Sequence, residues 1–288
     1  LLMRVAELTA VRTRTPAQTA ALSALLMRAG RAGDALNLLV PKPGDRSADF
    51  SLLANRAHAH ALRGEWAEAR LAHEQVTEDA KMPDDLLPQI TPAQRAWFDK
   101  LERTHYLRWL REHSRRERDR AAGQFSPETE GPFPLFDVNW VNDRGEYEPG
   151  QLAAAERAKL PPDAVPVVQQ LLLWSPGDTG LYWLLGELYA ATGRLRQANE
   201  IFNRVANARQ FSNRPIFMAH RAAVRAAVEK LPPEKSADDA PLDLPAEPPP
   251  AVRSVFPSVE RMAVVGGAFA VVAVALLALQ LRKLLRRR

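Results

Sequence analysis

Cysteine is absent from this chain of 288 residues. The protein can therefore form no disulfide bond, no zinc–thiolate site and no thiol nucleophile. This absence is compatible with either side of a membrane, so it indicates no cellular compartment.

The chain also lacks an excess of positive charge outside its last residues. Its formal net charge is +5. Five basic residues lie in the tail, namely Arg282, Lys283, Arg286, Arg287 and Arg288. Without them, 34 basic residues are balanced by 34 acidic residues. A protein that binds the phosphate backbone of a nucleic acid needs a basic surface. The balance of charges therefore argues against nucleic acid as a partner.

Motifs that carry catalytic or metal chemistry are also missing. The sequence contains no HExxH, GxxxxGK[ST], GxSxG or EF-hand pattern. His58 and His60 point in opposite directions on a helix, so they cannot chelate one ion. We predict packing roles for His60 and His73. The sequence thus predicts no cofactor, no metal site, no small-molecule substrate and no enzymatic activity.

A long uncharged run stands near the C-terminus. Met262–Leu281 contains no charged residue, and a helix of this length spans about 30 Å, the thickness of a bilayer core. We predict a transmembrane helix that contacts membrane lipid. Four of its small residues lie on one helical face, namely Ala263, Gly266, Ala270 and Ala273. They would permit a weak homodimer through the membrane helix.

The basic tail indicates the orientation of that helix. Short flanking segments rich in Lys and Arg stay cytoplasmic, and only Arg261, beside Glu260, lies on the other flank. We predict a single-pass protein with a cytoplasmic C-terminus and a soluble domain outside the cytoplasm, on the periplasmic side. This orientation requires a signal peptide upstream. The alternative is a tail-anchored protein whose soluble domain is cytoplasmic.

The first 80 residues show helical pairs with a fixed offset. The predicted helices open at Pro16–Ala17 and span Asp34–Val40, Phe50–Arg63 and Trp66–Asp79. Gly30 and Gly64 are 34 residues apart, as are Ala35 and Ala69. A helix–turn–helix period of this length is typical of stacked helical repeats.

The clearest repeat copy lies at residues 179–207. Its repeat positions are Tyr182, Leu185, Gly186, Tyr189, Gly193, Ala198 and Phe202. With this spacing the chain resembles the tetratricopeptide repeat (TPR) superfamily here and over residues 16–80, whereas residues 145–178 match only in their second half. The resemblance implies an all-α fold of TPR-like helical hairpins, an α-solenoid. Gly186 and Ala198 would let the two helices approach closely.

The period breaks in the middle of the chain. Thr91 and Gln94 form a capping-box pattern that opens a helix running toward Arg120. Its arginine-rich second half is predicted to be a solvated face with ion pairs such as Glu112 to Arg116. The following segment alternates apolar and polar residues around a turn at Asn142–Gly145, which predicts a short irregular or extended insertion.

The pattern predicts five parts. We expect TPR-like helical pairs over 1–83, an insertion over 84–144, TPR-like repeats with a capping helix (Arg214–Lys230) over 145–230, a disordered Pro-rich stalk over 231–260, and the transmembrane helix with its basic tail over 261–288.

The resemblance also implies a partner-binding surface. TPR arrays bind partners in the concave groove lined by the first helix of each repeat, and the candidates here are Asn55, His58, Trp183 and Glu187. The groove lacks the lysines of the TPR class that clamps peptide carboxylates. Trp183 would anchor an extended or helical peptide. The alternative is that Trp183 packs against a neighbouring repeat.

The sequence thus predicts a membrane-anchored, non-catalytic TPR-like scaffold that binds a protein or peptide partner. Its layout resembles exported, membrane-anchored bacterial TPR proteins. Two alternatives stay open. One is an enzyme subunit or hydrolase-type enzyme with its site in the 123–150 segment, where Glu146 and Glu148 are the candidate carboxylates. The other is a purely structural tether.

Overall fold

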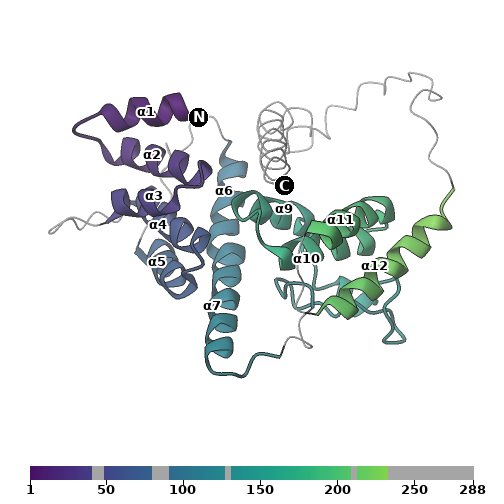
Figure 1. Cartoon of the computed structure of the whole chain (residues 1–288). Coiled ribbons are helices and arrows are strands. Elements are labelled where there is room, and N and C mark those ends of the chain that lie inside the picture. The colour runs from purple at the N-terminus through teal and green to yellow at the C-terminus, as the bar shows by residue number, and fades with distance from the viewer. Residues whose placement is uncertain (41–48, 80–90, 127–130, 209–212, 233–288) are drawn as a thin grey trace, which may run out of the picture. The chain divides into compact units, whose positions relative to one another are not determined.

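The structure, a computed structural model, describes residues 1–40, 49–79, 91–126, 131–208 and 213–232. Every regular element in these ranges is a helix (Figure 1). The helices are α1 (Leu2–Ala10), α2 (Pro16–Arg28), α3 (Ala32–Leu39), α4 (Phe50–Leu62), α5 (Trp66–Asp79), α6 (Pro92–Lys100), the π-helix η1 (Leu101–Tyr106), α7 (Leu107–Ala121), α8 (Ala154–Arg157), α9 (Ala164–Trp174), α10 (Thr179–Ala191), α11 (Leu195–Ala208) and α12 (Arg214–Glu229). The predicted all-α fold of helical hairpins is confirmed.

The N-terminal helices form two hairpins, α2 with α3 and α4 with α5. The hydroxyl of Thr15 accepts a hydrogen bond from the backbone N–H of Gln18 and closes a capping box, and Asp49 caps α4. Both hairpins turn at the predicted glycines. Gly30 has φ +74° and Gly64 has φ +76°, a left-handed conformation that glycine adopts without a Cβ penalty.

The first helix was not predicted from the sequence. Val5 and Leu8 of α1 are buried together with Leu22 and Leu26 of α2. A helix of this length has too few turns for a clear pattern, and packing on α2 provides its stability.

The middle of the described chain is one long helical stretch. The predicted capping box is confirmed, since Thr91 accepts from the N–H of Gln94 and the Gln94 side chain accepts from the N–H of Thr91. Within it, η1 adds a π-helical turn between α6 and α7. A π-helical turn inside an α-helix is uncommon and often occurs at functional sites.

Residues 131–153 contain two turns but no helix or strand. The predicted turn at Asn142–Gly145 is confirmed by the hydrogen bond from Gly145 N–H to Asn142 O (3.0 Å). No strand forms within this described segment, so the predicted extended insertion does not pair into a β-hairpin. Phe133, Leu135 and Phe136 are instead buried in the main core, and they fix the start of the segment.

The C-terminal helices repeat the hairpin design. In α10 and α11, Gly186 lies against the ring of Phe202, as expected from the close approach of two repeat helices. The last helix of the described residues, α12, buries Phe217 and Val224.

The predicted stalk and transmembrane helix lie outside the described residues. Within the described ranges, no helix is both long and apolar enough to cross a membrane. The span at Met262–Leu281 therefore stays a prediction.

Candidate protein-interaction surface

A buried carboxylate stands at the centre of the surface between α10 and α12. The side chain of Glu187 is 1% exposed. It accepts hydrogen bonds from the Tyr147 hydroxyl (2.8 Å), Trp183 Nε1 (2.8 Å) and His220 Nδ1 (2.7 Å). We call these four residues the Glu187 hub. The hub joins α10, α12 and the irregular segment before α8.

Aromatic contacts reinforce the Glu187 hub. The Tyr147 ring stacks on His220 with centroids 3.6 Å apart and planes at 10°. Trp183 meets Phe217 and His220 edge-on. Burial, with the nearby charge of Glu187, raises the pKa of Tyr147 far above its usual range. Tyr147 therefore stays a neutral hydrogen-bond donor to the carboxylate.

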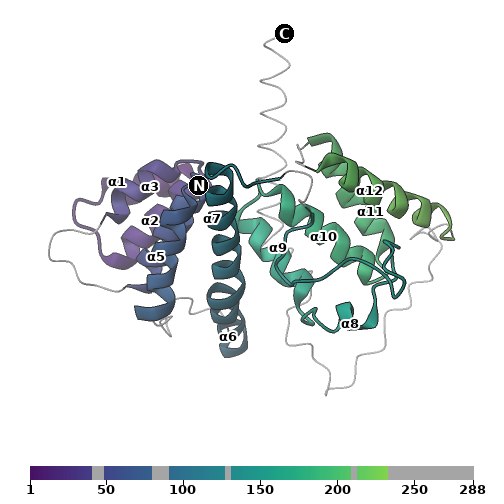
Figure 2. The ribbon, with the colours of Figure 1, turned by 90° about the horizontal axis from the view of Figure 1, so that it is seen from below.

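The irregular segment runs along α10 from its first turn to its last. The N–H of Phe133 donates to Gly180 O (3.3 Å) at the start of α10, and Tyr147 meets Glu187 further along. A hollow beside the hub is lined by Trp140, Tyr147, Glu148, Pro149, Gly150, Gln151, Leu152, Glu187, Ala190 and Ala191. Figure 2 shows the segment passing α10 on its way to α8.

The helices that carry this surface match a known repeat family. Residues 153–219, which contain α8 to α11 and the start of α12, match the tetratricopeptide repeat family. We call residues 153–219 the TPR region on the basis of this match. The resemblance predicted over 179–207 is thereby confirmed, whereas the resemblance over 16–80 lies outside the matched residues. No curated protein matches the chain.

The structure places both C-terminal groove candidates in the Glu187 hub. Trp183 is 2% exposed and packs on Phe217 of α12, as the packing alternative expects. Tyr147 and His220 were not predicted as site residues. The sequence contains one indication for His220. This residue lies three positions after Phe217 and therefore on the same face of the helix.

The N-terminal groove candidates lie on another helix, α4, and have other partners. Asn55 Nδ2 donates to Ala20 O (2.9 Å) and Ser23 Oγ (3.0 Å), so it ties α4 to α2. His58 Nδ1 lies 3.2 Å from the Tyr106 hydroxyl. Burial lowers the pKa of His58 to about 4, so the ring is neutral near pH 7. A partner-binding role for Asn55 and His58 stays a prediction.

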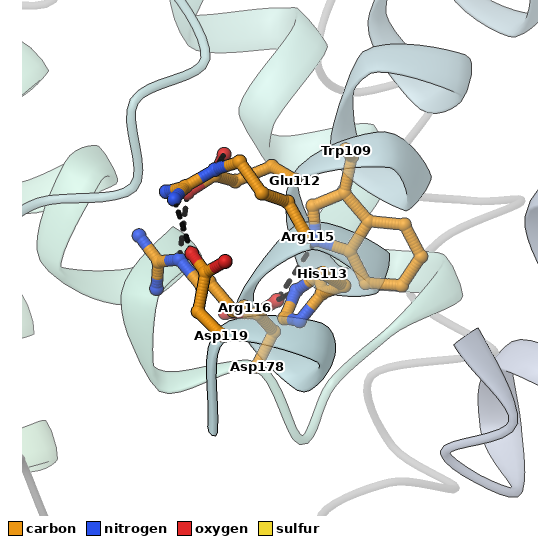
Figure 3. A network of polar contacts seen from close by, with 7 residues as sticks. All are labelled: Trp109, Glu112, His113, Arg115, Arg116, Asp119 and Asp178. Atoms are coloured by element: carbon orange, nitrogen blue, oxygen red, sulfur yellow. Dashed lines mark hydrogen bonds and ion pairs between the residues drawn. The ribbon is translucent and has the colours of Figure 1, made fainter. Parts of the chain in front are cut away.

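A hydrogen-bonded cluster of Trp109, His113 and Asp178 connects α7 to the TPR region. Asp178 caps α10 by accepting from Leu181 N–H, and its other oxygen accepts from Trp109 Nε1 (2.8 Å) and His113 Nε2 (2.7 Å) (Figure 3). Burial opposes ionisation of Asp178, but these hydrogen bonds outweigh it and lower its pKa. His113 also stacks on Trp66 of α5 with centroids 4.1 Å apart.

The arginines of α7 beside this cluster form the predicted ion pairs. Arg116 binds Glu112 (2.8 Å), and Arg115 bridges Glu112 (2.7 Å) and Asp119 (2.6 Å) (Figure 3). Arg115 is more than half exposed, and exposed pairs contribute little to stability. The predicted pair of Glu112 with Arg116 forms, but these two side chains are only 15% and 12% exposed, so this pair does not lie on a solvated face.

Titratable groups are also buried around η1. His73, for which the sequence predicts a packing role, is fully buried and its Nε2 lies 2.9 Å from Glu102 O. Burial raises the pKa of Glu102 to about 8 and lowers that of His73 to about 4. In the described part of the chain, no three His, Asp or Glu side chains are grouped to hold a metal ion.

Glu102 should make the protein less stable in mild alkali. Between its usual pKa of 4.5 and its folded pKa of about 8, the folded state holds a proton that the unfolded state has released. The free energy of unfolding therefore falls with rising pH, by about 1.4 kcal/mol per unit. Below pH 6.5, His58 and His73 have the opposite effect, because their lowered pKa values make the unfolded state bind more protons than the folded state. The decrease in stability due to Glu102 should therefore be visible from about pH 6.5 to 8.

The measurement is urea unfolding at pH 6.5 and 8. Glu102→Gln should remove most of the decrease, whereas Glu117→Gln, at an exposed position of α7, should retain it. An unchanged decrease in Glu102→Gln would mean that another group titrates.

Proposed function

We propose that the chain is a membrane-anchored TPR scaffold that binds a protein partner and carries out no chemistry. The observation that carries this proposal is the Glu187 hub, where α10 already holds a stretch of polypeptide through Tyr147. The general role of TPR regions in protein–protein interaction supports it.

The chemistry of the hub suits a polypeptide ligand. Trp183 and Glu187 are only 2% and 1% exposed, so a ligand can reach them only in place of Tyr147, which now stacks on His220 and bonds Glu187. Buried aromatic anchors combined with one polar contact are typical of the residues that dominate binding energy at protein interfaces.

Co-purification tests the scaffold proposal. Glu187→Gln keeps the size of the side chain but weakens its acceptor character, so a partner that uses the hub should be lost. Quantitative mass spectrometry of proteins retained by detergent-solubilised wild type and Glu187→Gln should show at least one protein depleted with the variant. Glu200→Gln, at an exposed position of α11, is the matched control. Identical sets for all three would contradict the proposal.

The anchor is the second part of the proposal. The uncharged run Met262–Leu281 and the five basic residues after it support a single span with its C-terminus in the cytoplasm. Membrane lipid is then a partner, and the small residues of the span permit a weak homodimer. The TPR region would lie outside the cytoplasm.

A single introduced cysteine tests this topology. The chain has no cysteine of its own, so Ser236→Cys provides one label site before the span. Treatment of intact cells or spheroplasts with a membrane-impermeant maleimide should label it. Labelling only after lysis would favour the tail-anchored alternative, and recovery of the full chain in the supernatant after ultracentrifugation would contradict any anchor.

The two alternatives make different predictions. An enzyme with its site in the 123–150 segment would use Glu146 or Glu148, both of which pair with Arg144 at 3.2 Å around the turn. Changing either carboxylate should then abolish an activity without affecting partner retention. A structural tether would retain no partner through the hub.

A further inference from the structure

The side of α10 that carries Glu187 is contacted by a loop of the same chain, residues 139–152. We propose that this loop is an internal ligand, latched by Tyr147, and that the partner is an extended segment that presents a tyrosine to Glu187 in its place. This inference rests on the proposed scaffold function and defines the partner for the same surface. The geometry of the loop supports it in four ways.

The loop is organised by its own contacts. Asn142 Oδ1 accepts from the backbone N–H groups of Arg144 (2.9 Å) and Glu146 (3.1 Å), and Asn142 Nδ2 donates to Glu148 (3.0 Å). Asn142 N–H also donates to Glu146 O (2.8 Å). A turn that satisfies its own polar groups can keep its shape when it leaves the helices.

The loop is held to the helices at a few points. Tyr147 bonds Glu187 and stacks on His220, Leu152 is buried, and Trp140 packs against the main core. At its start, Asn139 N–H donates to the side chain of Glu156 (2.7 Å). The residues before it, Phe133 to Phe136, are buried in the core and would stay in place.

The backbone bends at both ends of the loop. Asp137 has φ +53° although it is not glycine, and Gly150 has φ +86°. A non-glycine residue in this region stores conformational strain that rearrangement can release. The side chain of Asp137 is mostly exposed and pairs with Arg108 (2.5 Å), so no buried contact holds it.

The contacts of Tyr147 define the chemistry that a partner needs at this surface. Glu187 is buried and offers acceptors only, so an aromatic ring that lacks a donor would leave the carboxylate with one hydrogen bond fewer. Tyrosine supplies both the ring that stacks on His220 and the hydroxyl that bonds Glu187. The groove should therefore select tyrosine over phenylalanine.

A fluorescent peptide of residues 139–152 (NWVNDRGEYEPGQL) tests the inference by anisotropy against the full-length chain in detergent. A tethered loop has an effective concentration of roughly millimolar, so the wild type should bind the peptide weakly. Tyr147→Ala in the chain should free the groove and raise peptide affinity at least tenfold. The loop-tip control Asp143→Ala should bind like the wild type, and a peptide with phenylalanine at position 147 should bind at least tenfold more weakly to the opened chain.

Hydrogen exchange on the wild type gives a second measurement that needs no variant. Amides of the 139–152 loop should exchange through a local opening while amides of α10 and α11 remain protected. Exchange of the loop and these helices in a single step, or loss of helical circular dichroism in Tyr147→Ala, would make the loop an integral part of the core and overturn the inference.

The outcomes separate this inference from the proposed function. If a partner is retained equally by the wild type and Tyr147→Ala, and the opened chain binds no peptide, the internal-ligand inference fails and the scaffold stands. If the peptide binds the opened chain but no protein depends on Glu187, the scaffold proposal fails and the loop inference stands.

Discussion

Glu187→Ala should lower the free energy of unfolding by about 3–5 kcal/mol, the largest single effect expected in the described chain. The variant leaves Trp183 Nε1, His220 Nδ1 and the Tyr147 hydroxyl without their shared acceptor. Removing one member of a buried charged network costs this much because the remaining polar groups stay buried without partners. Chemical denaturation followed by circular dichroism measures the loss.

Two further variants distinguish the hub from simple loss of packing. Glu200→Ala removes an exposed carboxylate of α11, so it should change stability by less than about 1 kcal/mol. Tyr147→Phe should cost about 1.5–3 kcal/mol alone, because the lost hydroxyl bonds a carboxylate, and much less in the Glu187→Ala background. Additive losses in the double variant would contradict the shared network.

Gly186→Ala should destabilise the α10–α11 hairpin by about 1–3 kcal/mol, although alanine favours helices over glycine by about 1 kcal/mol. A Cβ at this position would lie 2.7 Å from Phe202 Cε1 and 2.8 Å from Cζ. The ring cannot yield easily, because Phe202 is fully buried. Gly186→Leu should cost more. Thermal and chemical unfolding measure both variants.

The control for this prediction is Gly177→Ala, where an added Cβ meets nothing within 4 Å. Combining Gly186→Ala with Phe202→Leu should cost less than the sum of the two changes, because the smaller side chain makes room for the Cβ. An unaltered melting curve for Gly186→Leu would contradict the register of the two helices.

The sequence predicted the parts of the fold that depend on local patterns. Pro16 and Thr91 with Gln94 marked helix starts, and Gly30 and Gly64 marked turns, because caps and left-handed turns depend on a few adjacent residues. The TPR spacing around Gly186 also encoded the closest helix contact. These features need no knowledge of distant segments.

The rest depended on contacts between distant residues. Tyr147 and His220 meet Glu187 across 40 and 33 residues, and no local pattern shows which face of an insertion will cover a helix. The π-helical turn η1 and the short helix α1 escaped prediction for a related reason, since tertiary packing stabilises both rather than intrinsic propensity. The sequence located Trp183 and Glu187 but not the loop that occupies their surface.

In-cell photo-cross-linking from the Glu187 hub tests the scaffold proposal most directly. p-Benzoylphenylalanine in place of Trp183 replaces one large aromatic side chain with another at the hub, and the same residue in place of Arg204, on the exposed face of α11, is the control. The account predicts a discrete protein adduct from position 183 that is absent from position 204. The absence of any adduct from position 183, with the chain folded and membrane-bound, would contradict it.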